Sequence, residues 1–335
     1  MNAQKNLGQT EIRIAGETCQ VPSATISGRT IVVVGKWIRM AAVKDEMVME
    51  GQSVTKPEAF IGQLKESGLR ADILTFVQQL PEITPKFSYP FIWDNVAAVH
   101  ITSFKDWWDH LPQESRKNTR RAAKRGVVVK IVPFDDELVM GVHKIYNETP
   151  VRQGRRFWHF GKDFDTVKRE LATYLSRSEF IGAYHHDQLI GFLKMVRVNC
   201  TGTLFHILTA NEHRDKKAMN ALIAKALEVC EQRRFSHFIY GQFVYGNKNQ
   251  SSLAEFKRRN GFERIDFPRY YVPITARGRV CVRLKLYKGL NGLLPEPLLQ
   301  TVLKCRACWY KVLSADRDAT NRKSVADRYC SDRTT

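Results

Sequence analysis

The 335-residue sequence has no run of about 18 uninterrupted apolar residues, so it predicts no transmembrane helix. Residues 1–10 lack a basic segment followed by an apolar run, and we expect no secretory signal. The seven cysteines are odd in number and widely spaced, which favours a reducing compartment over a disulfide framework. These absences predict a soluble, cytoplasmic protein.

Several kinds of catalytic site are also missing from the sequence. No glycine-rich nucleotide-binding loop is present, which argues against ATP hydrolysis. No serine-centred elbow is present, which argues against an α/β-hydrolase. Cys305 and Cys308 are separated by two residues, but no second cysteine or histidine pair stands at zinc spacing. We therefore expect no metal.

Positive charge is abundant and unevenly distributed. The chain has 53 basic and 34 acidic residues, a net charge of +19. Residues 1–100 contain ten of each sign, so the whole excess follows residue 100. A segregated excess indicates a surface for nucleic acid, anionic lipid or an anionic small molecule, and the alternative is solubility alone.

The first hundred residues mix strand and helix signals. Residues 11–50 contain alternating and β-branched runs that predict strands. Pro57 is tolerated in the first turn of a helix, and apolar residues recur after it at helical spacing. An apolar run follows and stops at Pro81, after which Pro85 and Pro90 indicate an extended connector. The strand-like runs are Ile12–Ile14, Ile31–Val34, Trp37–Val43, Met47–Met49 and Ile73–Leu80.

The rest of the chain alternates helices and strands. One helix over Trp107–Arg125 is predicted to stop at Gly126, and Asp135 is placed to cap a later helix. The order predicts an α/β (α+β) fold with a mixed central sheet and helices on both faces. Pro268 inside the last strand predicts a bulge or a sheet edge. The expected elements after Gly126 are Val127–Val132, Glu137–Asn147, Lys162–Arg177, Glu179–Tyr184, Leu189–Val198, Thr203–Ala210, Asp215–Arg233, His237–Tyr240, Ser251–Arg259 and Arg264–Val272.

A basic cluster occupies the predicted helix at residues 116–125. Residues four apart form rows on one helix face, and like charges in a row repel unless an anion neutralises them. Guanidinium groups bind phosphate through paired hydrogen bonds, so the pattern indicates a phosphate or nucleic-acid contact. The alternative is a solvated helix face. One row is Arg116, Arg120 and Lys124, and its neighbour is Lys117, Arg121 and Arg125.

A second cluster spans residues 148–159 and combines a carboxylate, arginines and aromatic rings. This composition suits a phosphate with a ring stacked beside it. Glu148 or His159 could act as a general base toward an amine. The alternative is an ordinary connection held by Trp158. The arginines are Arg152, Arg155 and Arg156.

Two further clusters lie near helix ends. Arg214, Lys216 and Lys217 stand at a strand-to-helix junction, where free backbone N–H groups and the positive helix end favour phosphate. The alternative is that these basic residues merely lie at the start of a helix and bind no ligand. Lys257 lies in a basic turn closed by Gly261, which is a weak signal alone.

Four segments, in this order and spacing, resemble a known superfamily. Residues 116–129 are similar to the basic helix, glycine and valine strand of Fem-type peptidoglycan-bridge aminoacyltransferases, and Ile145–Arg152 resembles the helix that follows there. Phe180–Phe192 resembles the central hairpin of the GNAT superfamily, and Phe256–Phe262 resembles a phrase near the end of both folds. The resemblance covers roughly residues 100–275.

The resemblance implies a domain arrangement. Fem-type proteins contain two GNAT-like halves, so residues 1–99 are expected to be a β-rich, reduced first half. Residues 100–290 would then form the acyltransferase domain. Beyond the resemblance, the residue pattern of 291–335 predicts a C-terminal amphipathic helix over 293–312 and then a disordered tail without apolar periodicity.

The resemblance also implies a reaction: transfer of an aminoacyl or acetyl group to an amine in a ternary complex, without a covalent enzyme intermediate. A backbone N–H near Ile207–Thr209 would polarise the donor carbonyl. Lys217 replaces a glycine of the usual coenzyme A loop, so the donor is either acyl-CoA or, as in Fem-type enzymes, aminoacyl-tRNA. The implied donor-binding residues are His206, Leu208, Arg214, Lys216 and Lys217, and the implied phosphate-binding residues are Arg116, Lys117, Arg120, Arg121, Arg152, Arg155 and Lys257.

The expected partner is an anionic substrate: tRNA, or a cell-wall or lipid precursor, with peripheral contact to a membrane surface. One alternative is a non-catalytic RNA- or anionic-membrane-binding protein on a GNAT-like scaffold, since fold does not fix function. Another is an ordinary acetyl-CoA N-acetyltransferase with an unusual pyrophosphate loop. No sustained heptads are present, so the coiled-coil arm of Fem-type enzymes is absent from the sequence.

Overall fold

The computed structural model describes residues 7–14, 17–152, 154–244 and 251–288. The chain divides into two compact units, residues 1–272 and 273–335. The predicted helix over 293–312 and the predicted tail lie outside the described residues. The domain boundaries expected after residues 99 and 290 remain predictions.

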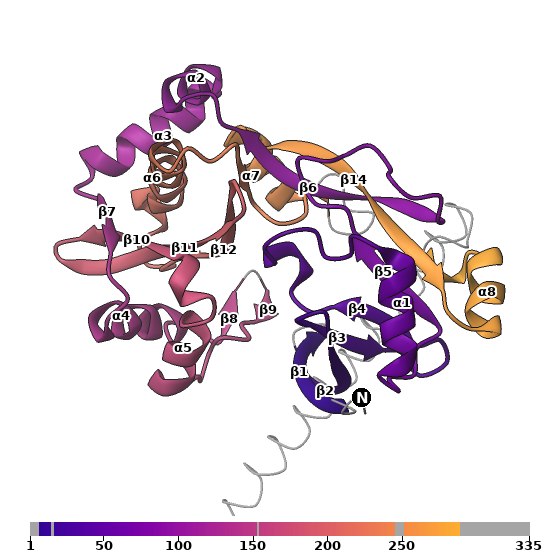
Figure 1. The fold of residues 1–335 in the computed structure, drawn as a ribbon. Coiled ribbons are helices and arrows are strands. Elements are labelled where there is room, and N and C mark those ends of the chain that lie inside the picture. The colour runs from indigo at the N-terminus through magenta and orange to yellow at the C-terminus, as the bar shows by residue number, and fades with distance from the viewer. Residues whose placement is uncertain (1–6, 15–16, 153, 245–250, 289–335) are drawn as a thin grey trace, which may run out of the picture. The chain divides into compact units, whose positions relative to one another are not determined.

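The first unit is built on one twelve-stranded mixed sheet (Figure 1). At one end β1 to β4 form an antiparallel meander, and β5 joins β4 in parallel after the crossover helix α1 (Pro57–Glu66). The predicted strand at Met47–Met49 is wrong, because Glu46–Val48 form a 3-10 turn after Asp45, which has a positive φ of 53°. The strands are β1 (Leu7–Ile14), β2 (Glu17–Ile26), β3 (Arg29–Val34), β4 (Met40–Val43) and β5 (Ile73–Val77).

The middle of the sheet contains β14 (Glu263–Pro273), β6 (Phe91–His100) and β13 (His237–Ile239). The strand β6 was not predicted. The expectation that Pro268 marks an edge or bulge is wrong, because β14 lies between β5 and β6 and runs in unbroken register along β6. Pro268 has no N–H to donate, but its carbonyl accepts a hydrogen bond of 3.1 Å from Gln78 N.

The far end of the sheet is β12 (Thr201–Thr209), β11 (Gln188–Val198), β10 (Ser178–His185) and β7 (Val128–Val132). The predicted hairpin is confirmed: β10 and β11 pair antiparallel across His186 and Asp187. Both turn residues have positive φ, 49° and 61°, the backbone twist that suits a two-residue hairpin loop.

The long helix predicted over Trp107–Arg125 is two helices, α2 (Phe104–His110) and α3 (Gln113–Lys124). The residue before a proline is pushed out of the helical region, and Leu111, before Pro112, is extended with ψ of 143°. Gly126 ends α3 as predicted, with φ of 76°. The helix predicted to reach Arg177 is shorter: α5 (Phe164–Leu171) ends before Tyr174, whose φ is 56°.

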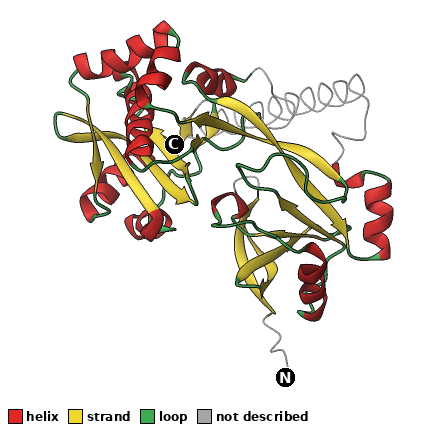
Figure 2. Ribbon diagram, turned by 45° about the horizontal axis from the view of Figure 1, so that its top comes forward, coloured by secondary structure: helices red, strands yellow, loops and turns green. Residues whose placement is uncertain are grey.

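Helices cover both faces of the far end of the sheet, as predicted (Figures 1 and 2). One core cluster joins α3 and α6 (Ala218–Gln232) to one face, through Ala122, Leu193 and Leu222. A second cluster joins α4 (Asp136–Tyr146) and α5 to the other face, through Val142, Phe192 and other residues. Asp135 caps α4 as expected, accepting a hydrogen bond of 2.9 Å from Leu138 N.

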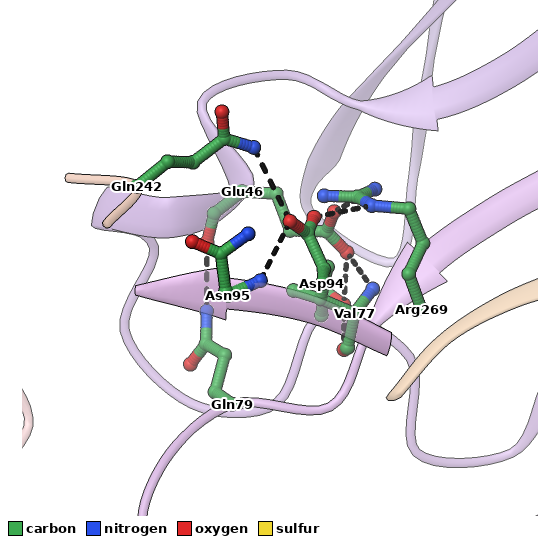
Figure 3. A network of polar contacts seen from close by, with 8 residues as sticks. Glu46, Val77, Gln79, Asp94, Asn95, Gln242 and Arg269 are labelled. Carbon is green, nitrogen blue, oxygen red and sulfur yellow. Dashed lines mark hydrogen bonds and ion pairs between the residues drawn. The ribbon is translucent and has the colours of Figure 1, made fainter. Parts of the chain in front are cut away.

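A buried polar network ties the N-terminal strands to the middle of the sheet (Figure 3). Glu46 Oε1 accepts hydrogen bonds from Ser53 Oγ at 2.6 Å and Val77 N at 2.7 Å. Arg269 of β14 lies 3.3 Å from Glu46 and 2.9 Å from Asp94 of β6. Burial raises the pKa of Glu46 above its ordinary value, while Arg269 acts in the opposite direction.

The described part of the second unit is short. Helix α8 (Ala276–Arg283) is capped by Thr275, whose hydroxyl accepts a hydrogen bond of 3.1 Å from Gly278 N. A 3-10 turn, Leu286–Lys288, follows. Across the described residues of both units, no helix has the length and apolar character needed to cross a membrane.

Candidate active site

The sheet splits between its parallel strands β12 and β13. Their pairing covers Thr201–Thr203 and His237–Ile239. Beyond this, β12 stays with β11 as far as Thr209, whereas the chain after β13 stays with β6 through Tyr240 N to Ala97 O, 2.7 Å. Along the described residues after Thr203, this edge of β12 has no partner strand. The arrangement leaves a line of backbone N–H and C=O groups facing the split.

A β-bulge lies where the split opens. Lys194 pairs with His206 and Met195 pairs with Leu204, so Phe205 is an extra residue on β12. A bulge re-aims the side chains next to it and increases the local twist. Phe205 and His206 both line a cavity of about 620 Å³.

The cavity has two walls. One comes from the N-terminal strands and the segment after β4, with Ile12, Val32 and Val43 among its members. The other comes from α4, α5 and the segment between them, together with β11 and β12. This second wall is rich in aromatic rings: Tyr146, Trp158, His159, Tyr174, Phe205 and His206.

Two histidines and a tyrosine meet in this wall. The hydroxyl of Tyr146 lies 3.0 Å from Nδ1 of His206. The ring of His159 packs on Tyr146, with centroids 3.9 Å apart, and lies 4.9 Å from that of His206. Tyr146 and His159 are buried, with 1% and 3% of their surfaces exposed, and His206 is half-buried. The predicted residues His159 and His206 are thus brought together, with Tyr146 as an unpredicted third member.

Lys194 is a second unpredicted residue of this wall. Its Nζ donates to Leu171 O at 2.8 Å, to Thr173 Oγ1 at 3.1 Å and also to Thr173 O, where α5 ends. Burial lowers the pKa of Lys194 to about 8. A cation at the carboxyl end of a helix complements the helix dipole, so Lys194 fixes α5 against the sheet.

Glu148 holds the loop that follows β12. Its carboxylate accepts hydrogen bonds from Asn211 N at 2.7 Å and Glu212 N at 2.8 Å. Arg152 Nη2 donates to the same carboxylate at 2.9 Å, and Arg152 Nη1 donates to Thr209 O at 2.9 Å. Because both oxygens of Glu148 are engaged, this geometry favours a positioning role over the predicted role of general base.

The far end of the sheet lies mostly within a segment that is similar to a known protein family. Residues 139–262 match the model of the acetyltransferase (GNAT) family. This segment is similar to the GNAT family. No curated protein matches the sequence.

Solved structures with the same fold extend the likeness beyond this segment. The chain is similar to FemX, at 10% identity and a TM-score of 0.56, over 83% of this chain and 90% of FemX. It is similar to L-PGS from Bacillus licheniformis at 14% identity and a TM-score of 0.50, over 81% and 89% of the two chains. The C-terminal domain of a putative lysylphosphatidylglycerol synthetase from Agrobacterium fabrum gives 13% identity and a TM-score of 0.50, over 79% and 88%. The predicted resemblance to GNAT and Fem-type proteins is confirmed at the level of fold.

Hydrogen bonds join helix α3 and helix α6 to the neighbouring elements that carry the predicted basic residues. Arg125, after α3, donates to Asp215 O in the turn before α6. At the other end of α3, Ser115 Oγ donates to Arg259 O at 2.6 Å, at the end of α7 (Ser252–Arg259). Asn220 of α6 in turn donates to Asn260 Oδ1 at 3.0 Å. The predicted phosphate-binding residues Arg116, Lys117, Arg120 and Arg121 lie along α3, and the predicted donor-binding residues Arg214, Lys216 and Lys217 lie in the turn that Arg125 contacts.

The split on the α6 side is partly filled. Ile207 of β12 and Tyr240 after β13 both pack against the core cluster that contains α6. Leu208 points to the other face and packs with α4 and α5. The cavity beside His206 is therefore on the opposite face of β12 from α6.

Two predicted phosphate ligands are differently placed. Lys257 is fully buried, and its Nζ donates to Gln242 O at 2.5 Å and lies 4.5 Å from the centroid of Tyr240. Arg152 is held by Glu148 and Thr209 O, and burial lowers its pKa. Both side chains are committed to internal partners, because each charge faces a carbonyl or carboxylate rather than solvent. Arg155 lies in the short strand β9 (Arg155–Arg156), and its side chain is outside the described part of the structure.

Lys217 adopts a backbone conformation that favours glycine. Its φ is 58° and its ψ is 27°, in the left-handed region, directly before the first residue of α6. This conformation costs a residue with a Cβ about 1–2 kcal/mol. The residue before α6 thus combines a left-handed backbone conformation with a Cβ and a positive charge at the helix N-terminus.

Proposed function

We propose that the protein transfers an acyl group from a phosphate-bearing donor to an amine in a ternary complex. The similarity of residues 139–262 to the GNAT family supports acyl transfer as the general reaction. The observation that carries the proposal is the split between β12 and β13, which exposes backbone N–H groups of β12 beside the His206 cavity. A free N–H at this edge can donate to the oxygen of a donor carbonyl as negative charge develops on it.

The donor's phosphate groups are assigned to the start of α6. The free N–H groups of a helix N-terminus favour an anion there, and Lys216 and Lys217 add positive charge. Arg120 and Arg121 on the neighbouring α3 are exposed and extend the cationic surface. This side accommodates either donor named above, a coenzyme A thioester or an aminoacyl-tRNA.

The amine acceptor is assigned to the cavity of about 620 Å³. The amine nitrogen attacks the donor carbonyl carbon, a C–N bond forms, and the bond from carbon to the donor's sulfur or oxygen breaks. The imidazole of His206 accepts the proton that the amine releases, and Tyr146 orients the ring through its hydroxyl. The departing thiolate or alkoxide takes up the proton that His206 accepted, which restores the neutral imidazole. No covalent enzyme intermediate forms, because the amine attacks the donor carbonyl directly.

The basic excess supports an anionic acceptor, for which cell-wall and lipid precursors are the proposed classes. Two of the similar structures carry the name of lysylphosphatidylglycerol synthetase or its abbreviation. That name describes those proteins, and here it only adds weight to an anionic acceptor.

A thermal-shift panel tests the proposal. Stabilisation by acetyl-CoA, or by aminoacyl-tRNA over uncharged tRNA, is expected at 0.15 M salt and would distinguish the two donors. Arg120→Ala combined with Arg121→Ala should weaken that stabilisation while changing the melting temperature without ligand very little, because both side chains are exposed. Stabilisation by heparin and uncharged tRNA alone, lost at higher salt, would instead indicate a non-catalytic polyanion-binding protein.

A further inference from the structure

We propose that a cavity at the carboxyl end of α6 binds a small phosphate ester. The donor turn at Lys217 lies at the other end of this helix, and the 15 residues of α6 separate the two ends by about 22 Å. The cavity would therefore hold a second ligand, and the proposal does not depend on the acyl transfer proposed above. It rests on a concave group of arginines that nearby carboxylates only partly neutralise.

The cavity has a volume of about 300 Å³ and lies where β10 begins and where β11 and α6 end. Met195 and Phe235 contribute apolar surface to it, and both belong to the core cluster that contains α6. Cavities of this size are at the small end of the range that binds organic ligands. The charged residues of the lining are Arg177, Arg197, Arg233 and Glu179.

One of the three arginines is neutralised directly. Arg233 Nη2 lies 2.6 Å from Glu179 Oε1, and a cation at this end of a helix also complements the helix dipole. This pair accounts for Arg233 without a ligand. Arg177 lies on the 3-10 turn before β10 and Arg197 lies on β11, so the dipole of α6 does not account for them.

Arg177 is held in place by neutral groups. Its guanidinium donates to Arg197 O at 2.9 Å and to Val48 O at 3.2 Å, and 18% of its side chain is exposed. The carboxylate of Glu50 is 3.8 Å away, which is outside hydrogen-bond distance. The two carbonyls therefore fix the orientation of the guanidinium, and its charge has no hydrogen-bonded carboxylate among the described residues.

Arg197 is the least neutralised of the three. Its side chain is exposed and makes no hydrogen bond or ion pair with any residue that the structure describes. Its cross-strand neighbour on β12 is Gly202, which has no side chain to offer. By contrast, Lys225 of α6 pairs with Glu228 at 2.8 Å. Arg197 therefore brings an unpaired guanidinium to the lining of the cavity.

The polar groups of the lining favour a phosphate that is joined to hydroxyl groups. Guanidinium groups bind phosphate oxygens through paired hydrogen bonds, and the hydroxyl of Ser176 is a further donor. Ser178 Oγ donates to Tyr174 O at 2.8 Å, so its oxygen is left to accept. Glu179 can accept more than its bond from Arg233, because a carboxylate has about four lone-pair sites. The cavity thus combines donors for a phosphate with acceptors for hydroxyl groups, as a polyol or sugar phosphate requires.

A nucleic acid fits this cavity less well than a small ester. Its successive phosphates would bring further negative charge near Glu179, which repels them. Its bases bind by stacking on accessible aromatic rings, but Phe235 is buried at 7% exposure. The lining therefore indicates a compact anion with a small carbon skeleton.

Calorimetric titration of the full-length protein with glycerol 3-phosphate tests the proposal, in about 0.1 M sodium chloride so that distant exposed charges are screened. Arg197→Gln should weaken binding about tenfold or more, because it removes a charge-assisted hydrogen bond. Arg197→Lys keeps the charge but loses the paired donors, so its affinity should lie between those of the unaltered protein and Arg197→Gln. Inorganic phosphate should bind more weakly than the ester, since it lacks the glycerol hydroxyl groups.

A matched control separates the cavity from a general effect of charge. Arg169→Gln removes an exposed charge from α5, which packs on the other face of the sheet, and should leave binding unchanged. The proposal is overturned if the unaltered protein does not bind glycerol 3-phosphate, or if Arg197→Gln binds it as tightly as the unaltered protein. Equal affinities for inorganic phosphate and glycerol 3-phosphate would overturn the assignment of an ester. Circular dichroism confirms that each variant is folded.

Discussion

Glu148 and Arg152 form an ion pair of 2.9 Å that holds the end of β12 from two directions. Arg152 binds the carbonyl of Thr209, the last residue of the strand, and Glu148 binds the backbone N–H groups of Asn211 and Glu212. The pair therefore fixes the free edge of β12, where the proposed carbonyl contact lies, without touching the reacting atoms.

Glu148→Gln should destabilise the protein by about 1–3 kcal/mol, because an amide oxygen accepts only part of this set and the amide NH2 faces backbone donors. Urea unfolding measures the loss. Glu137→Gln, at an exposed position of α4, should change stability by about 0.5 kcal/mol or less. If Glu148 only positions β12, the acyl-transfer rate should fall with little change in donor affinity. Equal losses of stability in the Glu148→Gln and Glu137→Gln variants would contradict the positioning role of Glu148.

Lys217→Gly and Lys217→Ala separate backbone strain from charge. Both remove the ammonium group and should weaken donor binding equally. Only glycine adopts the left-handed conformation without cost, so the glycine variant should be more stable than the alanine variant by about 1 kcal/mol. Thermal unfolding of the two variants under the same conditions measures this difference. Identical midpoints would show that the backbone of residue 217 is unstrained.

Arg269→Met should cost about 3–5 kcal/mol, because it leaves the buried Glu46 and the partly buried Asp94 without their cation. Burial already raises the pKa of Glu46 above its ordinary value of 4.5, and losing Arg269 should raise it further. The native state then holds a proton that the unfolded state releases, so stability should fall as pH rises above about 4.5. Denaturant titrations at several pH values measure this slope.

The double variant Glu46→Gln with Arg269→Met is the matched control. The amide keeps an acceptor for Ser53 and Val77 and carries no charge. The double variant should regain part of the lost stability, and its stability should depend much less on pH than that of Arg269→Met. A double variant as pH-sensitive as Arg269→Met alone would place the titrating group elsewhere.

Lys194→Met should alter the alkaline side of the stability profile. Burial lowers the pKa of Lys194 to about 8 from its ordinary 10.5. Between these values the unfolded state binds the proton and the native state releases it, so the contribution of Lys194 to stability rises with pH in this window. The stability of the Lys194→Met variant should rise less with pH than that of the unaltered protein. Lys257, whose pKa burial also lowers to about 8, should supply the remaining slope, and a profile unchanged by Lys194→Met would contradict the assignment.

His206→Asn should lower the acyl-transfer rate by about 10²- to 10⁴-fold, the usual contribution of a general base. Thermal unfolding should show that the variant remains folded. His110→Asn, at an exposed histidine of α2, should leave the rate unchanged. A rate that survives His206→Asn would move the base to another residue of the cavity.

Local patterns predicted the far end of the sheet well, since its strands and helices alternate clearly. The turn at His186 and Asp187, the cap at Asp135 and the stop at Gly126 each depend on a few adjacent residues. The break before Pro112 was also a local signal, but basic periodicity across it favoured one helix.

Other features depend on partners distant in the chain. The strand β6 is defined by its neighbours β14 and β13, about 140 residues or more away, and its own residues show no simple alternation. Lysines 194 and 257 carry charges that favour the surface, so their burial beside distant carbonyls gives no sequence signal. The hydrogen bonds of Glu148 were not predictable, because the backbone donors that it binds lie more than 60 residues later.

The short pairing of β12 with β13 has a mechanical consequence. Only three residue pairs join β12 to β13 among the described residues. This boundary between the two strands therefore resists shear less than the longer strand pairings around it. A substrate bound across this boundary would add contacts between the two strands. Occupancy of the site and rigidity of the sheet should therefore rise and fall together, and protection of these amides from hydrogen exchange would report substrate binding directly.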